Sequence, residues 1–385
     1  MHVVSTNSEL AAVCKRLGEA PYVAIDTEFM RESTFWPELC LVQMAGGGDE
    51  VLVDPIADGL DLAPFFELMA RERVLKVFHA GRQDIEIVYM KSGIIPHPVF
   101  DTQIAAMVCG FGESVSFSNL VKKVVGTDVD KSSQFTDWKR RPLTPKQLTY
   151  ALGDVIHLRP IYEYLKKELD RSDRSHWLEE EMADLTSPAT YDLHPEQAWQ
   201  RLKLRVKSRK ALAVLMELAE WRERSAQRQN VPRSRILKDE AIYDLANQLP
   251  QSPEQLTGLR TIHDGFARSA RGQEVLAAVK RGLGRDLKDL PPLERGEQIP
   301  GEAVAIMELL KVLLKAVAAD LGVAPKIIAT TEELEQIALN KAPDIPALKG
   351  WRRELFGEAA LKLKSGLLAL KIENGAVVTF EPARP

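Results

Sequence analysis

Short apolar runs alternate with helical patterns through residues 22–165, and this alternation limits the fold more than any other feature. Four of the runs are rich in Val, Leu and Ile and are bounded by Gly, Asp or Pro: YVAID, CLVQMA, EVLVDP and VLKVFHA. Such runs are typical of β-strands. Helical patterns lie at residues 60–70, 83–92, 101–109 and 145–165. Strands that alternate with helices in this way predict an α/β domain.

The remainder of the chain has a different pattern. From residue 196 onward no convincing strand occurs before AVVTF (376–380), and five helical patterns lie at residues 210–224, 238–249, 273–281, 302–320 and 331–340. A chain of 385 residues is too long for one ordinary domain. We therefore expect two or three domains, of which the later ones are helical.

The helical part contains a weak repeat. The stretch VPRSRILKDEAIYDLA (231–246) aligns with VAPKIIATTEELEQIA (323–338) at a constant offset of 92 residues. Both stretches follow a long amphipathic pattern, and a segment with three prolines, residues 286–301, separates the two copies as a linker. Spacing alone leaves open whether this is a true repeat or a chance match between two helical segments.

Charge is distributed unevenly along a chain whose net charge is −4. Residues 1–170 hold 18 Lys and Arg against 24 Asp and Glu, whereas residues 201–300 hold 20 against 13. An acidic front part and a basic middle part suit metal chemistry beside the binding of a polyanion. Ordinary solvated surface charge is the alternative explanation.

The cysteines and the apolar stretches indicate in which cellular compartment the protein works. Cys14, Cys40 and Cys109 lie far apart without a C-x-x-C spacing, which argues against a zinc site and a disulfide framework. The N-terminus lacks the pattern of a signal peptide, and the most apolar stretches carry charges every few residues. We expect a soluble cytoplasmic protein that does not enter a membrane.

Two carboxylates end the first apolar run. Asp26 and Glu28 are separated by one residue on a predicted strand, so their side chains point to the same face. Two carboxylates this close repel each other and raise each other's pKa unless a cation neutralises them. The pair therefore suggests a metal site, although solvated strand ends also carry such pairs.

A further acid follows the strand pattern at residues 74–80. Gly81 marks a turn, and Asp84 then lies in the first turn of a predicted helix. The helix dipole favours an acid at this position, which is the simplest explanation for Asp84. The loop after a strand is also where α/β sheets place their ligands. We interpret the neighbouring His79 as a hydrogen-bonded structural residue in preference to a ligand.

The last acid lies on a helix whose start is well marked. In LTPKQLTYALGDVIHL (143–158), Thr144 is a predicted N-cap, Pro145 takes the first helical position and Gln147 completes a capping box. Tyr150 and Asp154 are four residues apart and share one face of this helix. A tyrosine at the edge of the core beside a solvated aspartate would give the same pattern. We expect Pro160 to kink or end the helix.

The order of these residues, D-x-E, then D at a helix start, then Y-x-x-x-D, resembles the DEDDy branch of the DnaQ-like 3′–5′ exonucleases, and within it the ribonuclease D family. The stretches that carry the resemblance are IDTEFMRESTFWPELCLVQMA, FHAGRQDIEIV, FDTQIAAMV, DKSSQFTDWKRRPLTPKQLTYALGDVIHL and the two helical repeats, which resemble tandem HRDC domains. The resemblance covers nearly the whole chain and supports a true repeat.

The resemblance implies a fold and domain boundaries. It predicts an α/β exonuclease domain with the mixed sheet of ribonuclease-H-like and DnaQ-like proteins, followed by two all-α HRDC domains. The expected boundaries are residues 1–195 for the exonuclease domain, 196–285 for the first HRDC domain, 286–301 for the linker and 302–385 for the second HRDC domain.

The resemblance also implies an activity. It predicts hydrolysis of RNA from the 3′ end by two divalent cations, Mg²⁺ or Mn²⁺, about 4 Å apart, with release of nucleoside 5′-monophosphates. The residues expected to hold the cations are Asp26, which would bridge both, Glu28 and Asp154 at one, and Asp84 at the other. Tyr150 is expected to orient the attacking water, because an unperturbed phenol is a poor base at neutral pH.

The same resemblance implies a substrate. We expect RNA with an unpaired 3′ end, such as a tRNA precursor, and no protein partner. The alternatives are a DNA 3′–5′ exonuclease, since the same acids cleave either sugar, and a nucleic-acid-binding adaptor with an inactive nuclease domain. Retention of all four acids disfavours the adaptor.

Several other side chains are candidates for contact with nucleic acid. Phe29, Phe35 and Trp36 offer rings that could stack on bases, or pack in the core. Lys131 and Arg141 precede the last motif and could bind phosphates, or belong to a solvated loop. The run RLKLRVKSRK (201–210) opens the first helical repeat, and its candidates are Arg201, Lys203, Arg205 and Lys207.

Overall fold

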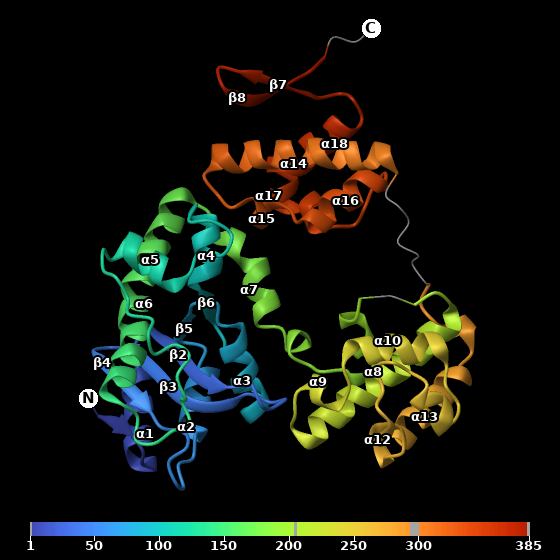
Figure 1. Ribbon diagram of the computed structural model, residues 1–385. Coiled ribbons are helices and arrows are strands. Elements are labelled where there is room, and N and C mark those ends of the chain that lie inside the picture. The colour runs from blue at the N-terminus through green and yellow to red at the C-terminus, as the bar shows by residue number, and fades with distance from the viewer. Residues whose placement is uncertain (1, 204–205, 293–299, 383–385) are drawn as a thin grey trace. The chain divides into compact units, whose positions relative to one another are not determined.

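The computed structural model describes residues 2–203, 206–292 and 300–382. The chain divides into two compact units (Figure 1). The first unit consists of residues 1–28, 39–191 and 298–385, and the second of residues 29–38 and 192–297. The segment at residues 29–38, which includes the end of one strand and the start of the next, thus belongs to the second unit.

The first unit contains a six-stranded mixed sheet with the order β1-β4-β3-β2-β5-β6. Strand β2 is parallel to β5 and β5 to β6, while β3 is antiparallel to β4 and β1 is parallel to β4. The strands are β1 (Val3–Val4), β2 (Tyr22–Met30), β3 (Glu38–Gly46), β4 (Asp49–Val53), β5 (Leu75–Phe78) and β6 (Val99–Asp101). The four predicted strands are β2 to β5. The sequence did not predict β1 and β6, which span only two and three residues.

Helices cover the sheet. Those of the first part of the chain are α1 (Asn7–Leu17), α2 (Ala63–Ala70), α3 (Arg82–Ser92), α4 (Thr102–Val108), α5 (Phe117–Val124), α6 (Pro145–Ser172) and α7 (Glu179–Leu185), with short 3₁₀ turns at Ser175–Leu178 and Pro188–Thr190. Helix α6 packs on the central strands, where Val155 and Leu158 meet Ala24 and Val77. Because Ala24 faces α6, the alternation of a strand turns Asp26 and Glu28 to the same face.

Helix α6 runs through Pro160 to Ser172, so this proline does not end the helix. The helix is buried on both sides of the proline. Leu158 lies before it, and Ile161, Leu165 and Leu169 lie after it, all nearly inaccessible to water. Packing of this apolar stripe offsets the hydrogen bond that a proline removes.

The second unit is helical. Its elements are a 3₁₀ helix at Pro195–Arg201, α8 (Arg209–Gln229), α9 (Arg233–Ile236), α10 (Asp239–Gln248), α11 (Pro253–Thr257), α12 (Asp264–Ala267), α13 (Ala270–Leu283) and a 3₁₀ turn at Leu287–Asp289. Helices α8 and α13 pack closely, since a Cβ added to Gly282 would lie 2.6 Å from the Cα atom of Val214. Phe35 is part of this core, and its backbone N–H donates to Asn230 at 3.1 Å.

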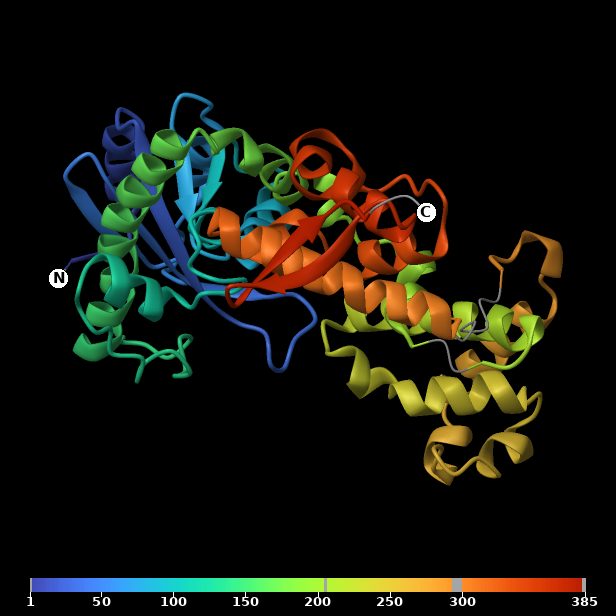
Figure 2. The ribbon, with the colours of Figure 1, turned by 90° about the horizontal axis from the view of Figure 1, so that it is seen from above.

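The C-terminal helices belong to the first unit. They are α14 (Gly301–Leu321), α15 (Pro325–Ile328), α16 (Thr331–Leu339), a 3₁₀ turn at Pro346–Leu348, α17 (Gly350–Arg352), a π-helical turn at Arg353–Gly357 and α18 (Glu358–Lys364). A two-stranded hairpin, β7 (Ala369–Glu373) and β8 (Ala376–Phe380), follows and lies along α14 (Figure 2). The AVVTF strand predicted from the sequence is β8.

One hydrophobic core joins the C-terminal helices to the preceding part of the first unit, which contains the six-stranded sheet. It includes Leu310 and Phe356 together with Leu120 and Leu165. The backbone N–H of Ala324 donates to the carbonyl of Met107 at 2.9 Å. The rings of Trp177 and Trp351 stack with their centroids 4.3 Å apart.

A buried arginine strengthens this packing. Arg352 is 4% exposed, and its Nε donates to the carbonyl of Ile327 at 3.0 Å. The same guanidinium forms ion pairs with Glu180 and, at 3.1 Å, with Glu181. The C-terminal helices are thus fixed to the part that contains the six-stranded sheet by a shared core and by charge.

The repeat expected from the sequence reappears in the helix boundaries. Helix α8 begins at residue 209 and ends at 229, and α14 begins at 301 and ends at 321, so both bounds differ by 92 residues. The short helices α9 and α15 keep this offset. Asn230 and Gly322 end the two long helices in the left-handed conformation. The two segments therefore share one helical layout.

Within the described parts of the chain, none of the helices combines the length and the apolar character that crossing a bilayer requires.

Candidate active site

The carboxylates of β2 stand on the face of the sheet that α6 covers. Asp26 and Glu28 are two residues apart on this strand and are only partly accessible to water. Ala24, on the same face, packs against Val155 of α6. The strand therefore forms one wall of the site, and the helix forms another.

The N-terminal turns of α6 carry the other two side chains of the motif. Thr144 and Gln147 form the predicted capping box, in which Gln147 accepts from the backbone N–H of Thr144 at 3.0 Å and donates its own backbone N–H to the Thr144 hydroxyl at 3.2 Å. Tyr150 and Asp154 follow one turn apart, and the phenol hydrogen-bonds with the carboxylate. Asp154 is 8% exposed.

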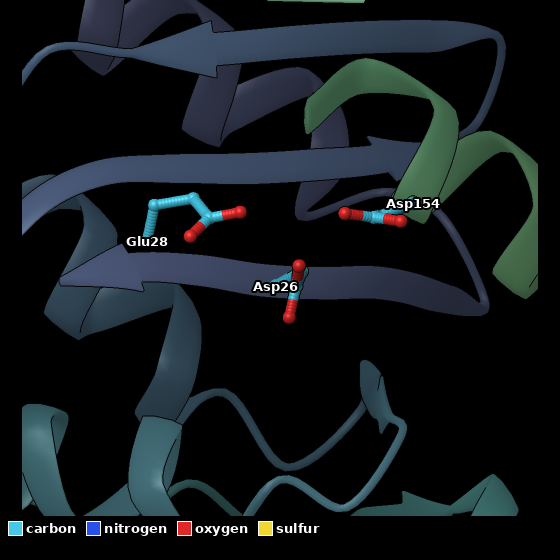
Figure 3. Close-up of side chains that lie close together, drawn as sticks. All are labelled: Asp26, Glu28 and Asp154. Carbon is cyan, nitrogen blue, oxygen red and sulfur yellow. The ribbon is translucent and has the colours of Figure 1, made fainter. Parts of the chain in front are cut away.

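Asp26, Glu28 and Asp154 form a compact group. Each offers a carboxylate oxygen that lies within 4.8 Å of the others. Figure 3 shows Asp26 and Glu28 on β2 and Asp154 on α6, with their carboxylates gathered in one space. Two elements far apart in the chain thus bring three negative charges together.

Burial and repulsion make these carboxyls hard to ionise. Burial, followed by the charges of Asp154 and Asp84, raises the pKa of Glu28 to about 9. Burial raises the pKa of Asp154 to about 7, against the hydrogen bond from Tyr150, which lowers it. Burial, and then the three neighbouring acids, raises the pKa of Asp26 well above its ordinary value. A nearby cation would reverse each of these shifts.

Asp84 lies beside this group and is held by the residue between the two β2 acids. The hydroxyl of Thr27 donates to Asp84, and both side chains are buried. Burial raises the pKa of Asp84 to about 6, and the Thr27 hydrogen bond opposes the shift. The carboxylate is close enough for its charge to raise the pKa of both Asp26 and Glu28.

The turn before Asp84 is specified by glycine and by a second aspartate. A Cβ on Gly81 would lie 2.4 Å from the Cβ of Phe78, so this position has no room for a side chain. Asp101 accepts from the backbone N–H groups of Ala80 and Gly81 at 3.1 and 2.8 Å and caps α4. This bonding fixes where α3 begins.

Tyr150 is screened from water on one side by a tryptophan. The rings of Trp138 and Tyr150 have centroids 6.0 Å apart, and Trp138 is 2% exposed. Burial, followed by the charge of Asp154, raises the pKa of the Tyr150 phenol further above its ordinary value. The phenol therefore stays protonated at neutral pH and serves as a hydrogen-bond donor.

Arg141, a candidate for phosphate contact, uses all five of its N–H groups within the protein. Nε and Nη2 bind the two oxygens of Asp54 at 2.7 and 2.6 Å. The other donors reach the carbonyls of Cys40, Trp138 and Arg140. This bonding argues against a contact with RNA phosphate and indicates a structural role. Lys131, the companion candidate, is exposed.

The candidates near the second unit have different environments. Phe29 is half-buried, whereas Phe35 is 3% exposed beneath the guanidinium of Arg233, 4.6 Å from the ring centroid, so Phe35 serves the core. Arg201 pairs at 3.0 Å with Glu223, whose side chain is 1% exposed. Lys203 and Lys207 are exposed. These two lysines precede α8, which begins at Arg209. Arg205 lies outside the described residues.

Two residues at the site escaped the sequence reasoning. Thr27 and Trp138 are the partners of Asp84 and Tyr150 described above. Thr27 lies inside an apolar strand pattern, where nothing local distinguishes it from a packing residue. Trp138 lies in a motif stretch, but a tryptophan in a loop gives no sign of what it packs against.

The donor set fits divalent metal ions. The grouped side chains offer only carboxylate oxygens, which hard cations such as Mg²⁺ and Mn²⁺ prefer. The raised pKa values of Asp26, Glu28 and Asp154 show that these charges are costly to bring together without a cation. The site is therefore built for divalent metal use.

Comparison with known proteins agrees with this geometry. The family described as 3′–5′ exonuclease matches residues 1–170, and the HRDC domain family matches residues 211–279. The ribonuclease D of Nitrobacter hamburgensis is 55% identical over 381 residues, which cover 99% of this chain and 100% of the relative. The ribonuclease D of Bartonella henselae is 44% identical over 382 residues, 98% of this chain and 94% of the relative.

A solved structure extends the likeness to three dimensions. The crystal structure of Escherichia coli RNase D, described as an exoribonuclease involved in structured RNA processing, matches with a TM-score of 0.81 at 29% identity. The match covers 94% of this chain and 98% of that one. The exonuclease and HRDC matches, the full-length relatives and the acidic site agree, and the chain belongs to the ribonuclease D family of hydrolytic 3′–5′ exoribonucleases.

Proposed function

We propose that this enzyme trims the unpaired 3′ ends of RNA, including tRNA precursors, and releases nucleoside 5′-monophosphates with the help of two divalent cations. The observation that carries the proposal is the group of Asp26, Glu28 and Asp154, whose oxygens lie within 4.8 Å of one another. Such a group is costly unless it binds cations. Family membership supports RNA as the substrate. The names of the relatives do not say which transcripts are trimmed.

Asp26, Glu28, Asp84 and Asp154 are the residues that would hold the cations. When bound, the cations lower the pKa of the attacking water and offset the negative charge that develops on the leaving 3′ oxygen. In the hydrolysis, the water oxygen bonds to the terminal phosphorus and the bond to the preceding 3′ oxygen breaks. The water supplies one proton to that oxygen, and the shortened RNA ends in a 3′ hydroxyl.

Tyr150 acts as a donor and not as a base. Burial and the charge of Asp154 keep its phenol protonated, and the phenol already hydrogen-bonds with Asp154. Its position, one turn from Asp154, allows it to orient the attacking water while it holds that carboxylate. Thr27 has the same supporting role for Asp84 on the opposite side of the acidic group.

We propose two HRDC domains, at residues 196–285 and 302–385, joined by a linker at 286–301, of which residues 293–299 lie outside the described part. Support for the second domain comes from the shared helical layout of α8 to α10 and α14 to α16. The exposed Lys203 and Lys207 would contact RNA backbone in the first domain. The second domain has as many acidic as basic residues, 11 of each over residues 301–385, and would have a scaffolding role.

A trimming assay tests the function. A 5′-labelled RNA hairpin with an unpaired 3′ tail is incubated with Mg²⁺ or Mn²⁺, and in parallel with EDTA. Asp154→Asn, which keeps the shape of the side chain and removes its charge, serves as the matched inactive control. One-nucleotide losses that stop near the duplex, and that vanish with EDTA and with Asp154→Asn, are the expected result.

Two further arms address the alternatives. A DNA strand of the same sequence separates a ribonuclease from a DNA exonuclease, and equal rates on both would contradict an RNA substrate. A tRNA precursor with a 3′ extension, compared with an unstructured RNA of equal length, tests the transcript class. An intact label under every metal would favour the adaptor, and titration calorimetry with Mn²⁺ would then show no binding.

A further inference from the structure

The segment from Val125 to Thr144 connects α5 to α6 and adopts neither helix nor strand. Connections longer than about 12–15 residues without secondary structure are uncommon in compact domains and are usually functional when they are ordered. We name residues 125–144 the α5–α6 loop. Its two large aromatic side chains differ sharply, because Trp138 is 2% exposed and Phe135 is 92% exposed.

We propose that Phe135 is a stacking platform for a base of the RNA strand upstream of the scissile bond, with Lys131 and Arg140 as its phosphate contacts. The inference rests on the proposed function, since it assigns a further substrate contact to the same active site. It adds a substrate-binding residue that the acidic motifs do not reveal.

The loop is attached to the catalytic helix at three points, which fixes the platform relative to Tyr150. Gln147 donates its amide to the Thr136 hydroxyl at 3.1 Å and to the Asp137 carbonyl at 3.3 Å. Lys146 pairs with Asp130 at 3.6 Å. The ring of Trp138 lies against Tyr150 itself. Phe135 is next in sequence to Thr136, one of these attachment points.

A hydrogen-bonded turn presents Phe135 to solvent. The carbonyl of Ser133 accepts from the backbone N–H of Thr136 at 3.2 Å and from its hydroxyl at 2.7 Å. The carbonyl of Lys131 accepts from the backbone N–H of Gln134 at 3.1 Å. The exposure of Phe135 is therefore a property of an ordered turn. Among the described residues, no other large apolar side chain is as exposed.

Exposed apolar side chains that occur singly need no function by themselves. The surroundings of Phe135 supply the argument. Asp128 pairs with Lys122 at 2.9 Å and Asp130 with Lys146, so two acids of the loop are neutralised by lysines outside it. Lys131 and Arg140 are exposed, and neither forms an ion pair with any residue that the structure describes. Phe135 thus lies between two available cations in the sequence, and sequence-tolerant proteins hold single-stranded nucleic acid with exposed rings and cations combined.

A cavity connects this loop with the catalytic tyrosine. It has a volume of about 630 Å³ and lies between the loop residues Asp128 and Asp130 and the α6 residues Tyr150, Gly153 and His157. This size is within the range of ligand-binding clefts. The cavity borders Tyr150, and the exposed Lys131 and Arg140 of the loop complement the phosphates of RNA, which favours RNA over a protein partner as the occupant.

Kinetics with three variants test the platform. Phe135→Ala removes the ring, Phe135→Trp keeps an aromatic face, and Ile372→Ala removes an apolar side chain that is 79% exposed on β7 and serves as the matched control. On an unstructured 5′-labelled 12-nucleotide RNA, Phe135→Ala should raise KM by about 5- to 100-fold, with kcat within about threefold. Phe135→Trp and Ile372→Ala should keep the native KM.

Abasic substrates separate stacking from a structural effect. A series of RNAs, each with one abasic nucleotide, should show a single upstream position where the missing base raises the KM of the native enzyme. In Phe135→Ala the same missing base should have no further effect, because ring and base act as one pair. An unchanged KM in Phe135→Ala, or an abasic effect that persists in this variant, overturns the proposal.

Binding without catalysis keeps this test independent of the proposed function. Fluorescence anisotropy of the labelled RNA is measured in EDTA, with the native full-length chain and with Phe135→Ala. A lower affinity of Phe135→Ala supports the platform, and equal affinity contradicts it, whether or not the native chain trims RNA. Loss of trimming by the native chain, by contrast, would contradict the proposed function alone.

Discussion

Tyr150 and Asp154 lie one turn apart on α6, and the phenol of the first hydrogen-bonds with the carboxylate of the second. The bond has opposite effects on its two ends. It holds the pKa of Asp154 below the value that burial alone would give, and it adds to the rise in the pKa of Tyr150. One contact thus favours a charged carboxylate and a neutral hydrogen-bond donor in the same site.

Replacement of Tyr150 by Phe should lower kcat by about 100-fold with little change in KM, because a donor at the reacting centre is lost and substrate contacts remain. The pKa of Asp154 should rise further, so the acidic limb of the pH–rate profile should move to higher pH. Tyr164→Phe, on the same helix but 40% exposed, is the matched control and should behave as the native enzyme. Full activity of Tyr150→Phe would show that the phenol has no part in the reaction.

The acidic group should make the metal-free protein less stable as pH rises. The pKa of Glu28 is raised to about 9 and that of Asp154 to about 7, both above the usual carboxylate value near 4 in an unfolded chain. A carboxyl with a higher pKa in the folded state stabilises that state below the unfolded pKa and loses this effect as it ionises. In EDTA, the thermal midpoint should fall between pH 6 and pH 9.

Two comparisons test whether the acidic group causes this decrease of the thermal midpoint with pH. Mn²⁺ or Mg²⁺ should raise the midpoint most at the alkaline end, where the carboxylates are charged. Asp154→Asn should flatten the slope in EDTA, whereas Asp58→Asn, a change at an exposed carboxylate, should leave it as in the native protein. A slope that is the same in both variants would locate the effect outside the acidic group.

Arg141 should matter for stability more than for RNA binding. Replacement by Lys keeps the charge and loses the two-pronged pairing with Asp54 and most of the three carbonyl contacts. We expect a loss of about 2–3 kcal/mol in the free energy of unfolding, measured with urea. Arg140→Lys, at the exposed neighbour, should change it by less than about 0.5 kcal/mol. Equal losses in both variants would be inconsistent with the contacts described for Arg141.

Arg352 should be needed to hold the C-terminal helices to the exonuclease part. Arg352→Ala removes the pairs with Glu180 and Glu181 and the bond to the Ile327 carbonyl, at an expected cost of about 2–3 kcal/mol. Its neighbour Arg353 has a 55% exposed side chain and one pair, 3.7 Å from Glu358. Arg353→Ala should therefore cost less than about 0.5 kcal/mol. Urea titrations of the two variants, measured side by side, decide this prediction.

The sequence predicted elements whose cause is local. The capping box of Thr144 and Gln147 marks the start of α6, and strand alternation alone turns Asp26 and Glu28 to one face. The sequence-based prediction failed where contacts with residues distant in the chain determine the structure. Pro160 would end an isolated helix, but α6 packs against the sheet before the proline and against other helices after it. Arg141 looks like a free surface cation until Asp54, 87 residues away, is placed beside it.

The sequence predicted the site only through the spacing of the residues that form it. A D-x-E pair, an acid at a helix start and a Y-x-x-x-D helix could each be explained without a metal, and only their order resembles a known family. No local pattern states that Thr27 supports Asp84, or that Trp138 covers Tyr150, because these contacts join separate elements. Side chains that support a site from another element are therefore the part that required the structure.

The shared core between the C-terminal helices and the exonuclease part bears on how the molecule can be divided. A cut after residue 195, which sequence patterns suggest, would remove Leu310 and Phe356 from the core that they share with Leu120 and Leu165. The severed catalytic fragment would expose an apolar surface on α4, α5 and α6, and such surfaces promote aggregation. The C-terminal copy of the helical layout is therefore part of the fold of the catalytic fragment, and its removal should lower the solubility of that fragment.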